Sequence, residues 1–298
     1  MHVLVTGGSG FIGRNLTPSL SKARHSVKVF DITEPGSHSV DYVSGDIRSY
    51  ESVLASLKGI DIVVHLAARI SVAESLEKPQ EYNAVNVTGS FNVMKACVEA
   101  GVPRFVYISS AAVYGDPAEL PLKETAPTMP LSPYGASKLA PEFYADAFFK
   151  SYGLETVVLR LFNVYGPGQP MNDYSGVITK FIERIRDGKA PIIYGTGGQS
   201  RDFIHIKDVA NAIELAVEKK GIAGETFNIA SGEPVTIGRL AEMMLAISGK
   251  ENLKPTHAAA RPADIMHSYA DISKAKNILG FTPSISLEDG LKSILFSG

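Results

Sequence analysis

A tyrosine and a lysine stand four residues apart, at Tyr134 and Lys138, in a stretch with helical character. Residues four apart share one face of a helix, so the phenol and the ammonium group are expected to be neighbours. An ammonium group one turn away favours the phenolate, which would lower the tyrosine pKa from its usual value of about 10. Ser110 ends a predicted strand and could hold the same substrate oxygen. We therefore expect Ser110, Tyr134 and Lys138 to act together in proton transfer.

The N-terminus carries a glycine-rich turn between a predicted strand and a predicted helix. Val3, Leu4 and Val5 indicate a buried parallel strand, glycines follow at 7, 8, 10 and 13, and a helix is predicted from about Phe11 to Ala23. Glycines allow a tight turn and let the backbone approach a pyrophosphate, which would bind the free N–H groups at the helix start. The alternative is a structural turn without a ligand.

An acidic residue supports the ligand-binding interpretation of this turn. Asp31 closes the next predicted strand, Ser26–Asp31, where a carboxylate can hold ribose hydroxyls. Ile32 and Thr33 follow it, so no cation stands there to receive a 2′-phosphate, which favours NAD over NADP. A nicotinamide near Tyr134 would take hydride from the carbon whose hydroxyl proton the tyrosine removes. The Tyr-x-x-x-Lys spacing alone arises often by chance, but it joins the glycine turn and Ser110 here.

Composition limits the broad class of the protein. A chain of 298 residues suits two closely joined domains, and 45% hydrophobic with 20% charged residues is ordinary for a soluble protein. The net charge of −2 gives no general attraction to nucleic acid or membrane. The single cysteine, Cys97, excludes an intrachain disulfide and fits a reducing compartment. With neither an apolar leader nor a spanning segment in the sequence, we expect a cytoplasmic protein.

Strands and helices alternate through the first half, which predicts an α/β fold with a doubly wound parallel (Rossmann) sheet. Beyond about residue 168 the alternation is less regular, and a smaller α/β part is expected there. Asp46, followed by Ile47, could bond an adenine or could cap the helix that begins near Tyr50. His65 is interpreted as a hydrogen-bonded core histidine, because no second ligand stands at a metal-like spacing, and no metal is expected. Pro141 predicts a local kink or a widened turn in the helix after Ser132.

These motifs together resemble an extended short-chain dehydrogenase/reductase of the nucleotide-sugar epimerase group, typified by UDP-glucose 4-epimerase. The resemblance covers essentially the whole chain. It is carried by Thr6–Gly13, Asp31, Asp46-Ile47, His65–Ala68, Asn86, Ser109–Gly115, Tyr134–Lys138, Arg160–Pro167, Tyr194–Phe203 and Arg261–Asp264.

The resemblance implies a bound NAD and a nucleotide-sugar substrate, a UDP-hexose. Its cofactor-binding positions are Gly7, Gly10, Phe11, Ile12, Gly13, Asp31, Asp46, Ile47, Leu66, Ala67, Ala68, Asn86, Ser109, Tyr134 and Lys138. Its substrate-binding positions are Ser110, Tyr134, Asn163, Val177, Arg201, Arg261, Asp264 and Ser268. It implies an NAD-binding domain of residues 1–165 plus about 203–230, and a nucleotide-sugar domain of 166–202 plus 231–298. A surface ion pair with a neighbouring Asp is the alternative for both Arg201 and Arg261.

In such enzymes the tyrosine removes the sugar 4′-hydroxyl proton, the 4-ketose rotates, and hydride returns to its other face. The sequence departs from the family pattern in three ways, at four positions. Ala111 and Ala112 replace the acidic pair of dehydratase relatives, which argues against loss of water. Ile70 replaces a lysine found near the phosphate in many epimerases, and Ser268, at the position that gates the sugar pocket, leaves room for an N-acetylated sugar.

Several alternatives remain open at this stage. Another nucleotide-sugar enzyme of the same family, such as a uronate epimerase, a decarboxylase or a reductase, would carry nearly the same motifs. A non-catalytic dinucleotide-binding protein is a different class, against which intact Ser110, Tyr134 and Lys138 argue. The resemblance also implies a homodimer that pairs through helices near 86–100 and 133–150.

Overall fold

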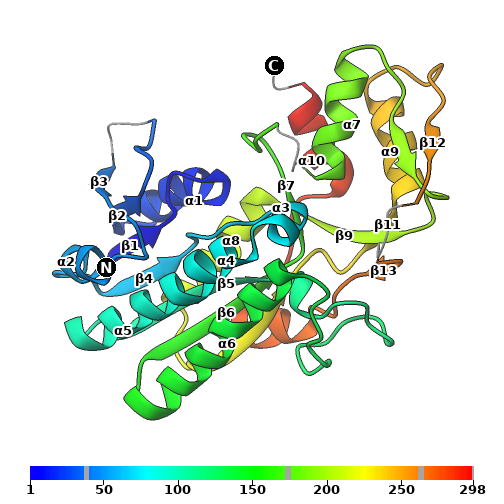
Figure 1. The fold of residues 1–298 in the computed structure, drawn as a ribbon. Helices are drawn as coiled ribbons and strands as arrows, with labels where there is room; N and C mark the ends of the chain where they lie inside the picture. The colour runs from blue at the N-terminus through cyan, green and yellow to red at the C-terminus, as the bar shows by residue number, and fades with distance from the viewer. Residues whose placement is uncertain (37–39, 172–175, 261–264, 297–298) are drawn as a thin grey trace.

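A computed structural model describes residues 1–36, 40–171, 176–260 and 265–296 of the chain. Seven strands within these residues form a parallel sheet in the order β10-β6-β5-β4-β1-β2-β3 (Figure 1). They are β1 His2–Thr6, β2 Ser26–Asp31, β3 Asp41–Ser44, β4 Ile62–His65, β5 Arg104–Ser110, β6 Glu155–Leu161 and β10 Glu225–Ile229. The strand order reverses beside β1, so the predicted doubly wound sheet is confirmed.

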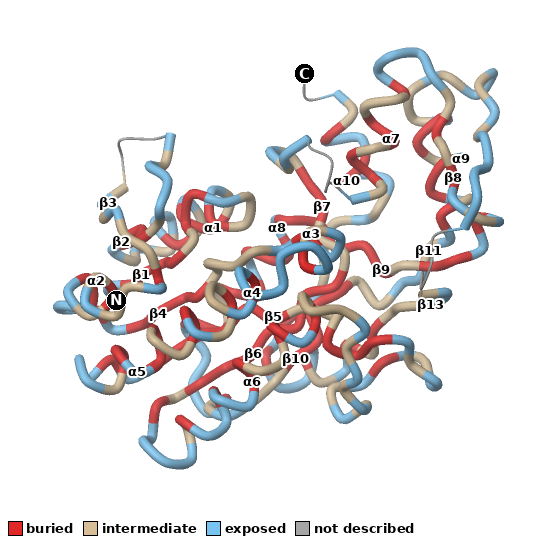
Figure 2. The backbone as a smooth tube through the Cα atoms, in the orientation of Figure 1, coloured by how far each residue is buried: buried red, intermediate tan, exposed pale blue. Residues whose placement is uncertain are grey.

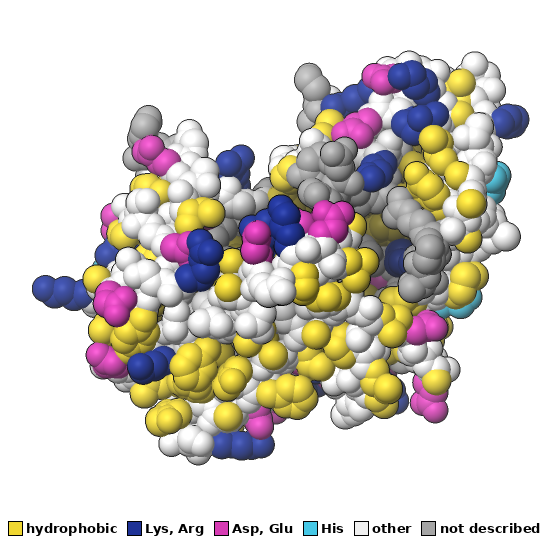
Figure 3. Space-filling model, in the orientation of Figure 1, with side chains coloured by type: hydrophobic (Ala, Val, Ile, Leu, Met, Phe, Trp, Pro, Cys, Tyr) yellow, Lys and Arg dark blue, Asp and Glu magenta, His cyan; other side chains and the backbone are white. Residues whose placement is uncertain are grey.

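Helices cover both faces of this sheet, which explains why its strands are continuous apolar runs rather than alternating ones. On one face lie α2 (Tyr50–Ser56), α5 (Ser90–Ala100) and α6 (Pro133–Tyr152). Their inward residues, such as Val53, Met94 and Ala145, pack on Leu4 and Phe105 of the strands. On the side of the molecule drawn in Figure 3, hydrophobic side chains also gather at the surface over α5 and α6.

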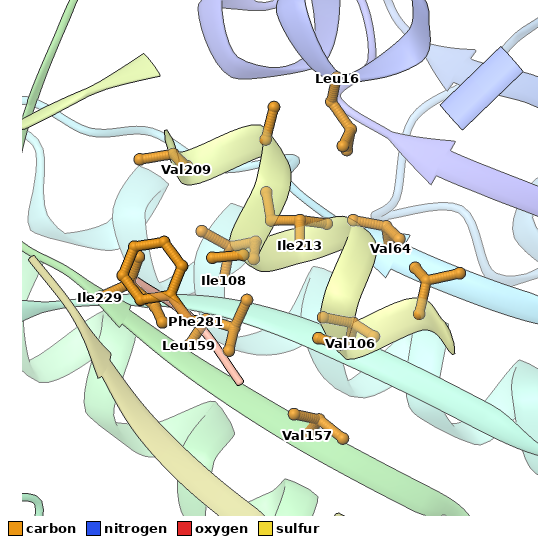
Figure 4. Packing of buried hydrophobic residues seen from close by; sticks show 14 of the residues in the cluster. Leu16, Val64, Val106, Ile108, Val157, Leu159, Val209, Ile213, Ile229 and Phe281 are labelled. Carbon is orange, nitrogen blue, oxygen red and sulfur yellow. The ribbon is translucent and has the colours of Figure 1, made fainter. Parts of the chain in front are cut away.

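The opposite face of the sheet is covered by α1 (Phe11–Lys22) and α8 (Ile206–Glu218), which contact each other. Figure 4 shows Leu16 of α1 with Val209 and Ile213 of α8 over Val64 and Val106 of the strands. These side chains are buried, and each fully buried aliphatic side chain contributes about 1.5–3 kcal/mol to folding. Figure 2 shows the buried stretches running through the strands of the central sheet.

The remaining elements form the smaller α/β part that the sequence predicts. β9 (Ser200–His205) pairs with β7 (Asn163–Tyr165), β11 (Pro234–Thr236) and β13 (His267–Ser268), while β8 (Ile192–Tyr194) pairs with β12 (Thr256–Ala258). The helices α7, α9 and α10 surround them, at Val177–Arg186, Ile237–Ile247 and Leu287–Leu295. Phe181, Leu240 and Leu291 belong to a separate buried cluster of this part.

Two helices differ in detail from the sequence predictions. α6 is capped by Ser132, which accepts a hydrogen bond from the Gly135 N–H at 3.1 Å, as predicted. It runs as one α-helix through Pro141, so the widened turn predicted there is wrong. A widened turn occurs instead before α5, where a π-helical segment, η1 (Asn83–Gly89), leads into that helix. It follows the short helices α3 (Val72–Glu77) and α4 (Pro79–Tyr82).

Candidate active site

A cavity of about 660 Å³ opens at the carboxyl edge of the central sheet, where β1, β2, β4 and β5 end. Ligands of doubly wound sheets bind at this edge, and the volume is typical of a small-molecule site. Its lining includes nearly all of the predicted cofactor positions, namely Gly7, Gly10, Phe11, Ile12, Gly13, Asp31, Asp46, Ile47, Leu66, Ala67, Ala68, Ser109, Tyr134 and Lys138. Ser110 lines it as well.

The glycine turn forms one wall of the cavity by close backbone packing. A Cβ atom at Gly7, where φ is +70°, would lie 2.5 Å from the Ala67 N atom, and one at Gly13 would lie 2.4 Å from the Gly8 O atom. Gly10 is the N-cap of α1 and has no side chain to bond the first N–H groups of the helix. Because Gly10 to Gly13 line the cavity, these groups and the positive end of the helix dipole fit a pyrophosphate.

Asp31 is held rigidly beside this turn. Its Oδ2 accepts a hydrogen bond from the Ser9 N–H and its Oδ1 accepts one from the Thr33 N–H, both at 2.9 Å. Each carboxylate oxygen has a further lone pair, so the group can still accept hydrogen bonds from ribose hydroxyls. The residues of this wall therefore fit the adenosine half of a dinucleotide.

Asp46 is not the cap of the following helix. The Ser49 side chain caps α2 by accepting a hydrogen bond from the Ser52 N–H, so that alternative for Asp46 is wrong. Asp46 instead pairs with Arg48 at 2.6 Å, and the hydrogen bond from Arg48 lowers the pKa of the Asp46 carboxyl. Arg48 also lines the cavity, with Arg14 and Arg69, and none of the three was predicted. Of the three arginines, Arg14 is the one that the sequence could have indicated, because it directly follows the glycine turn.

Ser110 and Tyr134 meet at the cavity because α6 begins close to the end of β5. A Cβ atom at Gly135 would lie 2.7 Å from the Ala112 O atom, so glycine allows this approach. Burial raises the pKa of Tyr134, and a hydrogen bond with Ser110 offsets part of this rise. The predicted lowering of the Tyr134 pKa by Lys138 is therefore wrong for the chain by itself, because loss of solvation outweighs the hydrogen bond with Ser110.

Lys138 lies over the ring of Tyr107, with its Nζ atom 4.6 Å from the ring centroid. Burial lowers the pKa of Lys138 to about 7, and the charge of Glu142 acts in the opposite direction. The Tyr107 hydroxyl donates a hydrogen bond to the Lys138 backbone O at 3.1 Å, which ties α6 to β5. The ammonium is thus positioned by packing, and its charge depends on its surroundings.

Two polar residues behind the cavity wall support the site. Asn86 is buried, and its amide donates to the Ser137 Oγ at 2.8 Å and the Arg69 O at 2.9 Å, while its Oδ1 accepts from the Arg69 N–H. His65 bonds Thr6 Oγ1 at 2.7 Å and Ser90 Oγ at 2.8 Å, which confirms it as a core histidine. Burial lowers the pKa of His65 to about 3.

The predicted substrate positions fall into two groups. Ser110 and Tyr134 line the cavity, whereas the following four lie on the smaller part of the fold, beyond the cavity lining: Asn163 on β7, Val177 at the start of α7, Arg201 on β9 and Ser268 on β13. Arg201 and Ser268 are register partners on adjacent strands. Arg261 and Asp264 lie outside the described residues.

The neighbouring Asp202 does not form the surface ion pair that was considered as the alternative role of Arg201. That carboxylate is fully buried and accepts hydrogen bonds from the backbone N–H groups of Ser231, Gly232 and Ala270. Arg201 donates to the Ser200 O atom at 2.8 Å. Asp202 therefore holds loops together, and Asn163 donates to its backbone O atom at 3.0 Å.

Comparisons with known proteins agree with this geometry. The model of the NAD dependent epimerase/dehydratase family matches residues 3–230. The chain belongs to this family. It is 32% identical over 304 residues to UDP-glucose 4-epimerase of Mycolicibacterium smegmatis, covering 98% of this chain and 96% of that one.

Solved structures of this family resemble the chain closely. UDP-glucose 4-epimerase of Thermotoga maritima with UDP-glucose is 34% identical, with a TM-score of 0.94 and coverage of 99% and 97%. The NAD complex of the Thermus thermophilus UDP-glucose 4-epimerase is 33% identical, with a TM-score of 0.89 and coverage of 99% and 98%. NAD is accordingly the cofactor, and the glycine turn and Asp31 fit it.

Family members with other activities match about as well, so the family alone leaves the reaction open. They include proteins named UDP-N-acetylglucosamine 4-epimerase, from Methanobrevibacter ruminantium and 36% identical, and UDP-glucuronate 4-epimerase, from Thermodesulfobacterium geofontis and 33% identical. A dTDP-glucose 4,6-dehydratase from Streptomyces venezuelae is 30% identical. This family member is therefore a nucleotide-sugar epimerase/dehydratase-type enzyme.

Among its described helices none is long and apolar enough to cross a membrane, and its described side chains form no group of three or more metal-type ligands.

Proposed function

We propose that the protein is an NAD-dependent 4-epimerase that interconverts UDP-glucose and UDP-galactose through a 4-keto sugar. The observation that carries this proposal is the convergence of Ser110, Tyr134 and Lys138 on the cavity that the glycine turn and Asp31 also line. Ala111 and Ala112 follow Ser110 in a single 3₁₀ turn. Two methyl side chains cannot supply the acid and base that loss of water requires, which supports epimerisation over dehydration.

Each residue of the catalytic group has a separate task. Tyr134 takes the proton of the sugar 4′-hydroxyl, and Ser110 bonds the same oxygen and orients it. Lys138 bonds the nicotinamide ribose and adds positive charge beside the phenol. Bound NAD supplies a hydride acceptor that also returns the hydride. Because burial raises the Tyr134 pKa in the chain alone, positive charge at the filled site is what makes this phenol a base near neutrality.

The same proposal extends to N-acetylated hexoses. Ser268 is a small, partly buried residue on β13, next to Arg201 on β9. A small side chain at this position leaves space beside the sugar. The protein should therefore also interconvert UDP-N-acetylglucosamine and UDP-N-acetylgalactosamine.

A panel of nucleotide sugars tests these statements. The NAD-loaded protein is incubated with UDP-glucose, UDP-galactose, UDP-N-acetylglucosamine, UDP-glucuronate and dTDP-glucose, and the products are separated by chromatography. We expect glucose and galactose forms to reach the same mixture from either side. Tyr134→Phe keeps the ring and should retain NAD, yet lower the rate by about 10²–10⁴-fold. Tyr50→Phe, which removes only the hydroxyl that bonds Glu99 at the surface, should be unaffected.

Other outcomes identify the alternatives. Turnover of UDP-glucuronate alone would make the protein a uronate enzyme, and accumulation of a dehydrated keto sugar would make it a dehydratase. NAD binding without turnover of any sugar would leave a dinucleotide-binding protein. Unchanged turnover by Tyr134→Phe would remove the proposed base.

The proposal includes a homodimer that packs through α5 and α6. Phe143, Tyr144 and Tyr152 on α6 are 66%, 41% and 64% exposed, and Phe91 of α5 makes an edge contact with Tyr144. They lie on α5 and α6, the helices over which hydrophobic side chains gather in Figure 3. Exposed apolar patches of this kind mark interaction surfaces.

A further inference from the structure

A buried ion pair lies beside the catalytic helix. The Glu142 carboxylate, on α6, meets the Arg160 guanidinium, on β6, at 2.6 Å, and both side chains are less than a tenth exposed. Arg160 Nε donates to both carboxylate oxygens at 3.1 Å. Its Nη1 atom donates to the Tyr114 hydroxyl and to the Glu124 backbone O. The carboxylate is therefore held in one position by a guanidinium group whose three nitrogen atoms all donate hydrogen bonds.

Glu142 also reaches the two elements that carry the catalytic group. Its Oε1 atom accepts a hydrogen bond from the Ser109 hydroxyl, and Ser109 directly precedes Ser110 at the end of β5. On α6 it stands four residues after Lys138, so the carboxylate lies one turn from the lysine on the same face. One carboxylate thus contacts the serine strand and faces the lysine.

A purely structural reason for this pair is weak. Desolvation of two charges costs about as much as their attraction returns, so well-packed apolar residues can replace a buried ion pair without loss of stability. The charge has a more specific effect on Lys138, which is buried on a cavity wall. Among the described titratable groups, Tyr134 and Glu142 stand one turn before and after this lysine on α6. The Tyr107 ring on β5 lies under its Nζ atom, and the lysine charge also acts on His65 of β4. Of these, Glu142 is the group that carries negative charge at neutrality.

We propose that Glu142, fixed by Arg160, is a positioning residue that keeps the Lys138 amine protonated and holds the Ser109–Ser110 end of β5 against α6. This rests on the proposed function, in which Lys138 must carry a charge beside Tyr134. Burial lowers the Lys138 pKa to about 7 even with the opposing effect of the Glu142 charge included. Without that charge the lysine would lose its proton below neutrality, and the alkaline limb of the pH–rate profile would move to lower pH.

The direct test is the titration of Lys138 in the full-length NAD-bound protein. The lysine Cε is labelled with ¹³C, and the Lys138 signal is identified by its absence in Lys138→Met. Because Glu142→Gln alone leaves Arg160 as an unpaired buried charge, the double variant Glu142→Gln/Arg160→Gln is measured beside it. In both variants we expect the Lys138 titration to move down by about one pH unit or more. Glu142→Asp retains the charge and should titrate close to the parent.

The control is a second Arg–Glu pair, which joins β5 to β6. Arg104 on β5 meets Glu155 on β6 at 2.7 Å, at the opposite ends of these strands from the cavity. Glu155→Gln removes a carboxylate from that pair and should leave the Lys138 titration unchanged. A shift in this control as large as that in Glu142→Gln would mean that general loosening of the sheet, rather than local charge, is measured.

The outcomes separate this inference from the proposed function. If the folded double variant titrates Lys138 as the parent does and keeps the parent pH–rate profile, the pair is structural and the inference is wrong. If the parent protein turns over no sugar, the proposed function fails, while the titration still shows whether Glu142 controls Lys138. A lower Lys138 titration with a matching shift of the alkaline limb of the rate profile supports both.

Discussion

Loss of solvation sets the protonation of three side chains at the cavity and behind it. Burial raises the pKa of Tyr134, lowers that of Lys138 to about 7 and lowers that of His65 to about 3. In each case the neutral form is favoured, because a protein interior solvates charge poorly. Glu142 and the bound cofactor must therefore supply the charge balance on which proton transfer depends.

His65 gives a stability prediction whose sign follows from its shift. Above pH 6.5 the folded and unfolded chains both hold this histidine neutral. As the pH falls, the unfolded chain takes up a proton near its ordinary pKa of 6.5, while the folded chain resists until about 3. Stability is therefore full above pH 6.5 and is lost between 6.5 and 3. From pH 7 to 5 the parent should lose about 2 kcal/mol more unfolding free energy than His65→Gln.

Denaturant unfolding at the two pH values measures this difference. His2→Gln changes an exposed histidine at the start of β1 and serves as the control, which should follow the parent. An equal loss of stability in parent and His65→Gln would show that His65 is not the group that titrates.

At the scale of elements, the site depends on how closely α6 approaches the end of β5. Ser132 and Pro133 start the helix at the required point, and Gly135 allows its first turn to touch the backbone at Ala112. A glycine also allows a close approach in the π-helical segment η1. A Cβ atom at Gly89 would lie 2.6 Å from the Ile47 side chain. Widened turns of this kind occur often at functional sites, and this one carries Asn86, which bonds Ser137 of α6.

Gly135→Ala tests the approach of the helix. The added methyl group would lie 2.7 Å from the Ala112 backbone O, which cannot rotate away, so the first turn of α6 must shift. Tyr134 would then move relative to Ser110, and kcat/KM should fall roughly 10- to 100-fold. Unfolding free energy should drop by about 1–3 kcal/mol. Steady-state kinetics and denaturant unfolding measure the two effects.

The control for Gly135→Ala is Ala136→Ser, which changes the next residue on the exposed side of the same turn. It should keep both activity and stability. Parent-like kinetics in Gly135→Ala would mean that the contact between α6 and β5 has enough slack to accept a methyl group.

At the scale of the whole molecule, a large sheet carries the cofactor cavity and a smaller part carries the remaining predicted substrate positions. Asn163 and Arg201 lie on paired strands of the second sheet, so both belong to that part. The apolar face over α5 and α6 belongs to the larger part. Because α6 also carries Tyr134 and Lys138, a partner packed there would steady the catalytic helix.

Phe143→Asp tests the dimer. Phe143 is 66% exposed, so a carboxylate costs little in the monomer but would be buried unpaired at an apolar interface. Light scattering during size-exclusion chromatography should give a mass near twice 31.9 kDa for the parent and near 31.9 kDa for the variant. Phe296→Asp, at a residue 70% exposed beyond the end of α10, should remain dimeric. A monomeric parent would refute the dimer.

Local features of the sequence were sufficient for the architecture and for most of the cavity. Apolar runs between turn residues predicted the parallel strands, and the glycines predicted the turn that lines the cavity with Asp31. Ser132 and Thr236 cap their helices through residues only a few positions away, which is the kind of local contact that a sequence can reveal. Ser110 followed from its place at the end of a predicted strand, and the resemblance to a known family added other lining residues, such as Leu66, Ala67 and Ser109.

Only the tertiary structure decided the pKa shifts at the site and the side-chain partners of its charged residues. Spacing on a helix placed Lys138 near Tyr134 but did not reveal how deeply both are buried, and so the direction of the Tyr134 pKa shift was wrong. The pairing of Glu142 with Arg160 joins a helix to a strand, and the capping role considered as one alternative for Asp46 belongs to Ser49. These properties depend on solvent exclusion and on contacts between distant segments. Neither is encoded in local residue spacing, whereas helix, strand and turn formation largely is.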